Sequence, residues 1–391
     1  MNILIVHNLY RLPGGEEVMA AGEQKMLQAH GHKVLTYFRN NGELAGFSLW
    51  QKMCLPFSVL FNPRTYREVR EIIRKENIQL VHVHNTLMLI SPAVYYAARR
   101  EGAAVVQSVH NFRLLCPGAV FYRDGHVCED CLQKGLGCAL KHRCYRGSFS
   151  ETLCCVLSMK LHRATGIYKK LTYICLTEFN KQKLLSLKGL SSEQIFVKPN
   201  SVEPAKKIMP WESRERQILY VGRLEERKGV KVLLESWRRL GPQAPTLVLC
   251  GSGPLESWCG DFVRENGLKN VKSLGFVENS RVREMLSESM AMILPTQLYE
   301  GFPISIAEAF SAGTPVLVSR LGNAGSLVEE GVTGLKFDQE DPDSIARTVR
   351  AFLEEKRDWS KAALEKYRGE LTPEENYRRL LETYERAVAS K

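Results

Sequence analysis

Two glutamates eight residues apart are side chains that could bind a ligand or take part in catalysis. Glu300 and Glu308 lie in the segment QLYEGFPISIAEAFSAGTPVL, residues 297–317. Gly301 permits a tight bend and Pro303 suits the first turn of a helix. The free N–H groups of that turn would make an anion site beside Glu300. The carboxylates could accept hydrogen bonds from hydroxyl groups, such as a ribose diol at Glu308, although the spacing alone also fits a helix cap and surface charge.

A second candidate element is YVGRLEERKGVKVLLES, in which a strand pattern is followed by Arg223 and Lys228 and then by a helical pattern. Two cations at the carboxyl end of a strand, next to a helix N-terminus, suit a diphosphate whose negative charge grows as the bond to it breaks. An ordinary solvated loop would have the same composition. The assignment therefore depends on the other motifs.

Two glycine pairs also occupy turns between strands and helices. Gly14 and Gly15 lie in HNLYRLPGGEEVMAAGEQ, and Gly251 and Gly253 lie in CGSGPLESW. Such glycines let the backbone approach a ligand closely, although any tight turn can use them. The second pair lacks the third glycine of a dinucleotide fingerprint, so NAD binding is disfavoured.

The stretch VCEDCLQKGLGCALKHRC, residues 127–144, carries a cluster of cysteines. A Cys-x-x-Cys pair with two further thiols suits a tetrahedral structural zinc ion, which could hold a segment that has few core-forming residues. The predicted ligands are Cys116, Cys128, Cys131 and Cys144, with Cys138 as a fifth candidate and His126 or His142 as substitutes. A disulfide or free thiols remain the alternatives, and a redox or iron–sulfur role is disfavoured.

The remaining sequence supplies the elements that must position these residues. β-rich runs alternate with amphipathic helical patterns along the whole chain, which is typical of parallel sheets with crossover helices. The first set of predicted strands is 2–7, 33–38, 80–85, 104–110 and 173–177, and the second set is 218–222, 246–251, 271–277, 291–296 and 315–320. A polar stretch at 198–217 separates the two sets and is predicted to be a linker.

This alternation predicts an α/β protein with two doubly wound, Rossmann-like domains facing each other across a cleft. Ligands in such sheets bind beyond the carboxyl ends of the strands. We expect the first domain at 1–199, with the cysteine-rich insertion at about 111–150, and the second at 200–371. The last segment, 372–391, is expected to form a helix that packs back on the first domain.

The composition disfavours disordered, fibrous and multispan membrane proteins as classes for this chain. The hydrophobic fraction of 44% and the charged fraction of 25% are ordinary for a globular protein. Residues 1–200 hold 26 Lys and Arg against 14 Asp and Glu, so the whole net charge of +11 comes from this half. The start, MNILIVHNLY, is expected to be a strand rather than a signal peptide, which predicts a cytoplasmic protein.

Together these motifs resemble glycosyltransferase family 4. The matching segments are PGGEE, SVHNF, VKPNSVE, GRL…KG, CGSGPL, EGFPISIAEAFSAGTPVLVS and GNAGSLVEEGVTGLKF, which follow the family's order over nearly the whole chain. The resemblance implies the two-domain GT-B architecture. It also implies an enzyme that transfers a sugar from a nucleotide-diphosphate sugar with retention of anomeric configuration.

The resemblance further implies roles for individual residues. Glu308 would hold the ribose, Glu300 the hydroxyls of the donor sugar, and Arg223 and Lys228 the diphosphate. His110 matches the family histidine that contacts the donor sugar near its anomeric carbon. The donor-binding residues implied are Gly14, Gly15, Gly251, Gly253, Gly301, Phe302, Pro303, Ile304 and Glu308.

Such enzymes generally need no catalytic metal, because cationic side chains and helix N-termini neutralise the diphosphate. The one Asp-x-Asp sequence, at Asp341 and Asp343, is better explained as a helix N-cap. We expect a UDP-sugar as donor and a glycan or lipid-linked acceptor in bacterial surface polysaccharide assembly. A nucleotide-sugar epimerase of the same architecture remains an alternative, and a nucleic-acid-binding protein is a weaker one because it leaves the Glu300–Glu308 segment unexplained.

A peripheral position on the inner face of a membrane is a further expectation. The longest apolar stretch, FSLWQKMCLPFSVLF at 47–61, is interrupted by Lys52 and Pro56 and is too short to span a bilayer. It could be a buried helix or loop, or it could approach a membrane. Residues 134–198 hold 12 Lys and Arg against 3 Asp and Glu, so a positive surface there could attract anionic lipid.

Overall fold

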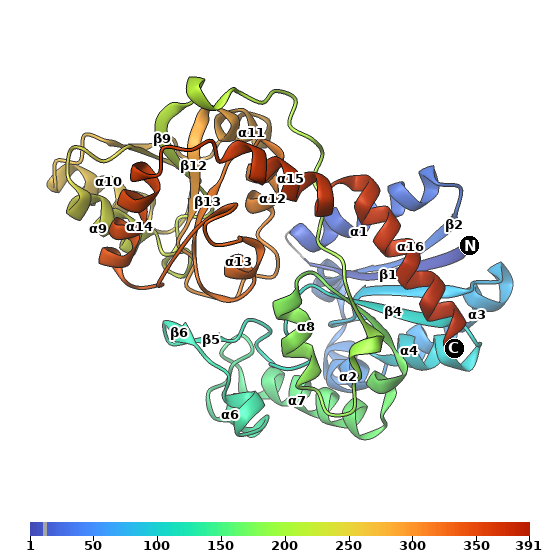
Figure 1. The fold of residues 1–391 in the computed structure, drawn as a ribbon. Coiled ribbons are helices and arrows are strands. Elements are labelled where there is room, and N and C mark those ends of the chain that lie inside the picture. The colour runs from blue at the N-terminus through green and yellow to red at the C-terminus, as the bar shows by residue number, and fades with distance from the viewer. Residues whose placement is uncertain (11–13) are drawn as a thin grey trace. The chain divides into compact units, whose positions relative to one another are not determined.

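The protein, seen here in a computed structural model that describes residues 1–10 and 14–391, divides into two compact units (Figure 1). The first unit comprises Met1–Phe121, Glu129–Lys198 and Tyr377–Lys391, and the second comprises Tyr122–Cys128 and Pro199–Asn376. Each is built around a six-stranded sheet whose paired strands all run parallel. The fold is therefore the α/β, doubly wound architecture that the alternating pattern predicts.

The sheet of the first unit has the strand order β2-β1-β3-β4-β7-β8. Its strands are β1 (Asn2–Leu9), β2 (Lys33–Asn40), β3 (Leu80–Asn85), β4 (Ala104–Val109), β7 (Thr172–Cys175) and β8 (Ile195–Val197). All six residues of β3 and of β4 are buried, as expected for central strands covered on both faces. Five of the six strands correspond to predicted ones. The edge strand β8 was not predicted, because three residues carry too little periodicity to read.

Helices cover this sheet, and the last helix of the chain is one of them. They are α1 (Gly15–Ala29), α2 (Leu49–Leu60), α3 (Pro63–Glu76), α4 (Ala93–Arg100), α7 (Phe149–Ala164), α8 (Glu178–Leu185) and α16 (Pro373–Ala389). Leu380, Tyr384 and Ala387 of α16 lie in one buried cluster with Ile3 and Ile5 of β1. Helix α16 thus completes the core of the first unit with side chains from the end of the chain.

The cysteine-rich insertion between β4 and β7 contains only short elements. They are the hairpin strands β5 (Tyr122–Arg123) and β6 (His126–Val127) and the helices α5 (Asp130–Gln133) and α6 (Gly137–Lys141). A small cluster of Leu136, Ala139, Val156 and Met159 fixes α6 on α7, with Cys131 and Cys144 packed against it. The hairpin residues Tyr122–Cys128 group with the second unit rather than with the rest of the insertion.

The sheet of the second unit has the order β11-β10-β9-β12-β13-β14. Its strands are β9 (Glu215–Val221), β10 (Thr246–Cys250), β11 (Val271–Ser273), β12 (Ser289–Leu294), β13 (Val316–Ser319) and β14 (Gly334–Phe337). The strand predicted at 271–277 ends at Ser273, so its last four residues form a loop. The short edge strand β14 was not predicted from the sequence.

The helices of the second unit are α9 (Val230–Leu240), α10 (Glu256–Glu265), α11 (Asn279–Glu288), α12 (Ile304–Ser311), α13 (Gly322–Leu327), α14 (Pro342–Glu354) and α15 (Ser360–Glu370). Two large buried clusters line the two faces of the sheet, one centred on Trp237 and the other on Phe310. Asp341 caps α14 by accepting a hydrogen bond from the N–H of Asp343 at 2.9 Å. The N-cap prediction for this Asp-x-Asp sequence is confirmed.

The apolar segment 47–61 forms helix α2, and its expected burial is wrong for most of its side chains. Leu49, Trp50, Met53 and Phe57 are between 68% and 82% exposed. No helix within the described ranges 1–10 and 14–391 is long and apolar enough to cross a membrane.

Candidate active site

The best-defined part of the site lies where the strand order of the second sheet reverses. Strands β9 and β12 are neighbours there, although 67 residues separate their ends at Val221 and Ser289 in the chain. Arg223 and Lys228 follow β9, and Glu300 follows β12. Because parallel strands present their carboxyl ends at one edge, the topology brings these loops together at the position where ligands bind in such sheets.

Lys228 and Glu300 form an ion pair at this edge. The Lys228 ammonium donates to both carboxylate oxygens of Glu300, at 2.8 and 2.9 Å. The hydroxyl of Thr296 also donates to Glu300 Oε1 at 2.7 Å. Only 10% of the Glu300 side chain is exposed, against 24% for Lys228. The carboxylate is therefore fixed by Lys228 and Thr296, while part of the Lys228 side chain remains exposed.

Gly229 explains why the two loops can meet. Its φ of +73° is in the left-handed region, and a Cβ built there would collide with the carbonyl oxygen of Pro295, immediately after β12. Only glycine combines this conformation with such a close approach. The contact seats the loop that carries Lys228 directly on the loop that leads to Glu300.

Arg223 lies on the other side of the β9 loop, at a cavity of about 590 Å³. The cavity is lined by Arg223, by the glycines after β10, Gly251 and Gly253, and by the segment Phe276–Asn279. The Arg223 side chain is 64% exposed, and its contact with Glu225, at 3.7 Å, is long. A Cβ at Gly251 or Gly253 would collide with the backbone of Gly222 or Leu224. The glycines thus let the β10 loop close one wall of the cavity.

Glu308 is hydrogen-bonded to a residue on the wall of the same cavity. Asn279, at the start of α11, donates its side-chain N–H to Glu308 Oε1 at 2.8 Å. Burial raises the pKa of the Glu308 carboxyl, and the Asn279 hydrogen bond and the charge of Arg283 oppose that rise. With one oxygen held by Asn279, the second oxygen can accept a further hydrogen bond from a ligand hydroxyl.

The segment between the two glutamates differs from its prediction in one detail. Helix α12 starts at Ile304, so Pro303 is its N-cap rather than a residue of the first turn. The side chain of Asn323 donates to the carbonyl of Gly301 at 2.9 Å and to that of Glu300. Phe302 packs against the core cluster of Phe310. Backbone anchoring by Asn323 therefore fixes the turn that carries Glu300.

In the first unit, His110 follows β4 and is almost fully buried. Its Nε2 lies 2.9 Å from Nδ1 of His84 at the end of β3, and the two rings are stacked with centroids 5.2 Å apart. Burial lowers the pKa of His110 to about 4, with Lys198 adding to that effect and Glu23 opposing it. At neutral pH the His110 imidazole is therefore uncharged.

A buried charge network lies behind His110. Lys198 donates to Glu23 Oε1 at 2.8 Å, and the second oxygen of Glu23 lies 3.4 Å from His84 Nε2 and 3.4 Å from His82 Nδ1. Tyr384 of α16 lies 2.7 Å from the same His82 nitrogen. Of these charged groups, Glu23 is 6% exposed and Lys198 is 2% exposed. The network therefore joins four separate chain segments under the edge that carries His110.

The glycine loop after β1 is linked to this edge by one hydrogen bond. Gly14 and Gly15 lie where α1 begins, and residues 11–13 of the same loop lie outside the described residues. Asn111, next to His110, donates to Glu16 Oε1, next to Gly15, at 2.9 Å. A Cβ at Gly15 would meet nothing within 4 Å. Nothing in the fold of the described chain thus requires glycine at this position.

The cysteine cluster is only partly gathered. Burial raises the pKa of the Cys131 thiol to about 12, and the neighbouring thiols Cys116, Cys144 and Cys138 add to the rise. Cys128 is grouped with the other unit. Within the described residues, the one set with three candidate ligand atoms inside 4.8 Å is Glu23, His82 and His84, not the thiols. The geometry therefore gives no support to a zinc site at the cysteines.

The Glu23, His82 and His84 group is better explained as a charge network than as a metal site. Lys198 already neutralises the Glu23 carboxylate, and its ammonium would repel a metal cation at the same position. The sequence offered one overlooked signal for this network. In the run LVHVHN the two histidines alternate with valine, so they point to the same face of the strand. Phe276 and Val277 were missed because they were read as the end of the strand predicted at 271–277, and Asn279 stood in no motif.

Two family models match the chain. Glycosyltransferase Family 4 matches residues 13–127, and Glycosyl transferases group 1 matches residues 201–385. An uncharacterized glycosyltransferase of Methanocaldococcus jannaschii is 27% identical over 264 residues, which is 59% of this chain and 66% of the relative. A glycogen synthase of Mycobacterium tuberculosis is 30% identical over 189 residues, 46% of this chain and 45% of the relative. The chain thus spans between about half and two thirds of these relatives.

Solved structures agree with the fold over the full length. A glycosyltransferase from Rickettsia africae superimposes with a TM-score of 0.71 at 16% identity, covering 99% of both chains. The lipopolysaccharide outer core galactosyltransferase WaaB gives 0.68 at 16%, covering 98% of this chain and 99% of that one. At these identities the likeness shows the fold alone. The two family models together cover most of the sequence, and the chain belongs to glycosyltransferase family 4, with the GT-B fold.

Proposed function

We propose that this chain is a retaining glycosyltransferase that moves a hexose from a nucleotide-diphosphate sugar to a hydroxyl of a glycan or lipid-linked acceptor. The observation that carries the proposal is the pairing of Lys228 with Glu300 at the sheet edge where Arg223 lines a cavity. A cation pair next to a fixed carboxylate suits a ligand that has a diphosphate at one end and sugar hydroxyls at the other.

The residues that line the cavity indicate where the nucleoside would bind. Phe276 is 73% exposed at the mouth of the cavity, where an aromatic ring can contact a base. We assign the ribose diol to the second oxygen of Glu308 and the close approach of the diphosphate to the loop of Gly251 and Gly253. The glycines remove side chains from that path, and Arg223 lines the cavity with 64% of its side chain exposed and a long contact of 3.7 Å to Glu225.

The proposed reaction needs no protein nucleophile. The bond between the anomeric carbon and the diphosphate oxygen breaks, and the acceptor oxygen bonds to the same face of that carbon. The acceptor proton passes to the departing phosphate oxygen, so charge and atoms balance. Arg223 and Lys228 stabilise the negative charge that develops on the diphosphate, which is where preorganised cations lower a barrier most.

We assign His110 to the donor sugar near its anomeric carbon, and Glu23 and His84 to positioning it. The carboxylate of Glu23 favours the tautomer of His84 that carries its proton on Nε2. His84 Nδ1 then accepts, and His110 Nε2 donates to it across the 2.9 Å contact. This assignment fixes the ring and leaves Nδ1 of His110 as the nitrogen available to other groups.

UDP is the nucleotide we favour, and surface polysaccharide assembly is the process. A structural neighbour, HepE of Anabaena, was solved with UDP-glucose, with a TM-score of 0.63 at 16% identity over 98% of this chain and 99% of that one. An amylovoran biosynthesis glycosyltransferase of Erwinia amylovora is 28% identical over 220 residues, 53% of this chain and 54% of the relative. Both support the proposal by analogy only.

The test is a screen of UDP-, GDP- and ADP-sugars for protection against thermal unfolding, followed by an acceptor-dependent transfer assay. We expect a UDP-sugar to raise the midpoint by several degrees and the product to keep the anomeric configuration of the donor. Conversion of the donor without an acceptor would favour an epimerase instead. No protection by any nucleotide sugar would refute the proposed donor class.

Zinc at the cysteines remains a prediction that metal analysis can test. The residues in question are Cys116, Cys128, Cys131 and Cys144, and the proposed reaction assigns no step to the metal. Protein purified under reducing, chelator-free conditions should contain about one equivalent of zinc if these thiols bind it. Zinc well below one equivalent would remove the hypothesis.

A further inference from the structure

Helices α2 and α7 together expose an apolar surface in the first unit. Helix α2 contributes Leu49, Trp50, Met53 and Phe57, whose spacing places them along one side of the helix. Helix α7 packs against α2 and contributes Phe149, Leu157 and Leu161, which are between 42% and 52% exposed. We call these seven residues the α2–α7 surface. Large apolar side chains that gather on neighbouring helices mark an interaction site more often than chance exposure does.

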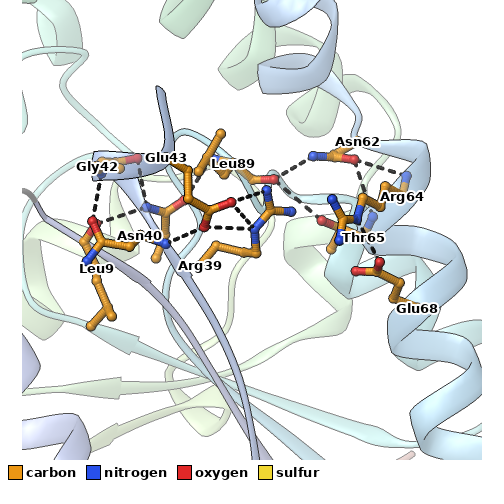
Figure 2. A network of polar contacts seen from close by, with 12 residues as sticks. Leu9, Arg39, Asn40, Gly42, Glu43, Asn62, Arg64, Thr65, Glu68 and Leu89 are labelled. Carbon is orange, nitrogen blue, oxygen red and sulfur yellow. Dashed lines mark hydrogen bonds and ion pairs between the residues drawn. The ribbon is translucent and has the colours of Figure 1, made fainter. Parts of the chain in front are cut away.

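The α2 helix is held firmly, so this exposure is a property of the fold. Just before α2, Arg39 donates to Glu43 at 2.7 Å and Asn40 caps the short turn that follows it (Figure 2). Just after α2, Asn62 caps α3 and donates to the carbonyl of Leu89 at 2.5 Å.

A further bond holds the end of α2 to α7. The ring Nε2 of His162 donates to the carbonyl of Leu60 at 2.8 Å. A network thus fixes the chain on both sides of α2, and α7 fixes its last residue.

The charges around the surface are almost all positive. Residues 49–60 contain Lys52 and no acidic residue, and residues 141–170 contain seven Lys and Arg against the single acidic residue Glu151. That glutamate already lies 3.6 Å from Arg146. Lys52 on α2, Lys160 on α7 and Arg146 just before α7 are all exposed. An apolar face that carries Trp and Phe and is bordered by cations is complementary to a bilayer with anionic headgroups.

We propose that the α2–α7 surface docks the protein on an anionic lipid bilayer, with Trp50 and Phe57 inserted at the interface and Lys52, Arg146 and Lys160 at the headgroups. A hollow of about 150 Å³ between the two helices is lined in part by Leu55, Pro56 and Met88, with Lys52 and Glu151 also on its wall. The surface stands apart from the transfer reaction. Docking would bring the enzyme to a lipid-linked acceptor, and this consequence rests on the proposed function.

The experiment measures binding of the full-length protein to phosphatidylcholine vesicles with and without 30% phosphatidylglycerol, by flotation at low and high salt. We expect binding to the anionic vesicles only, weakened by salt. The variant Trp50→Ser/Phe57→Ser should bind roughly tenfold more weakly or worse. Removing Lys52, Arg146 and Lys160 together should weaken binding by roughly fivefold for each charge that reaches the surface.

A matched control comes from exposed apolar residues of the second unit. Ile208 and Val332 are 41% and 47% exposed and lie outside the α2–α7 surface. Ile208→Ser/Val332→Ser should bind vesicles as the unchanged protein does. Equal binding by the control and by Trp50→Ser/Phe57→Ser would overturn the proposal.

A second copy of this chain is the other occupant of the α2–α7 surface that an experiment can reveal. Light scattering should show the same molar mass for the protein and for Trp50→Ser/Phe57→Ser. An oligomer that only this variant dissociates would assign the surface to a second copy and refute lipid docking. Nucleotide-sugar protection against unfolding should be unchanged in the variant, so a failure of lipid docking and a failure of the proposed donor site are separable.

Discussion

The candidate site residues of the two units handle charge in opposite ways. In the second unit Arg223 lines a cavity and the Lys228 side chain is 24% exposed, so both cations are partly open to solvent. In the first unit the charges of Glu23 and Lys198 are buried against each other, and the residue at the edge, His110, is neutral. The first arrangement suits binding of an anion. The second suits the exact placement of an uncharged ring.

The largest expected effect comes from breaking the open arrangement. Lys228→Ala should lower kcat/KM by roughly a thousandfold, about 4 kcal/mol, because an ammonium group aimed at developing charge is lost. Steady-state kinetics with a UDP-sugar and its acceptor measure it. Lys231→Ala is the control, since Lys231 pairs with Glu226 at 2.7 Å and not with Glu300. Equal activity in both variants would contradict the assigned role.

Breaking the buried arrangement should act first on stability. Glu23→Gln leaves the Lys198 ammonium buried without its carboxylate and should cost about 3 kcal/mol in the free energy of unfolding. Glu23→Gln/Lys198→Met removes both charges and should recover much of that loss. Urea denaturation measures both variants.

The same pair of variants separates a role of Glu23 in positioning His110 from a role in stability alone. If Glu23 orients His110 through His84, the double variant should regain stability without regaining kcat, and its pH–rate profile should differ from that of the unchanged protein. Recovery of full activity together with stability would assign Glu23 a structural role alone.

Gly251 in the second unit and Gly15 in the first allow a comparison with a smaller expected effect. Gly251→Ala should destabilise the protein by about 2 kcal/mol, because its Cβ would strike the backbone of Gly222 at a φ of +152°. Gly15→Ala should leave the unfolding free energy unchanged or slightly higher, since α1 begins there and the space is open. If Gly15 faces the donor, this variant should nevertheless raise KM for the donor. An unchanged KM would remove Gly15 from the site.

The smallest expected effect is a pH dependence of stability. Burial lowers the pKa of both His82 and His110 to about 4. The unfolded chain, with ordinary histidines, therefore binds protons first as the pH falls, and stability is lost from about pH 6.5 down towards pH 4. We expect a loss of roughly 1 kcal/mol between pH 7 and pH 6. His82→Gln should flatten this slope, whereas replacement of the exposed His142 should not, and equal slopes would contradict the assignment.

The sequence predicted the fold and the site residues of the second unit better than it predicted the buried charge network of the first unit. Ten strands with clear β patterns were predicted, whereas β8 and β14 were missed because three or four residues at a sheet edge carry no reliable period. Arg223, Lys228, Glu300 and Glu308 were predicted because motifs at strand ends point to a common edge. Their partners Thr296, Asn279 and Asn323 were not, since a single polar residue in a loop has many possible partners.

The buried network was beyond the sequence for a different reason. Glu23, Lys198 and Tyr384 come from distant segments, and only the packing of α1, α16 and the chain after β8 brings them to His82. Charged side chains are most often solvated, so the residue types of Glu23 and Lys198 give no sign of burial. For α2 the sequence left burial and membrane approach open, and Leu49, Trp50, Met53 and Phe57 are exposed.

The most direct test of the account is a calorimetric titration of UDP into the unchanged protein and into Arg223→Ala/Lys228→Ala. The account predicts saturable, one-to-one binding to the unchanged protein and an affinity at least roughly thirtyfold lower in the double variant, since two cations that contact the diphosphate are lost. Equal affinities for the two proteins would contradict the claim that this edge of the second unit binds the donor.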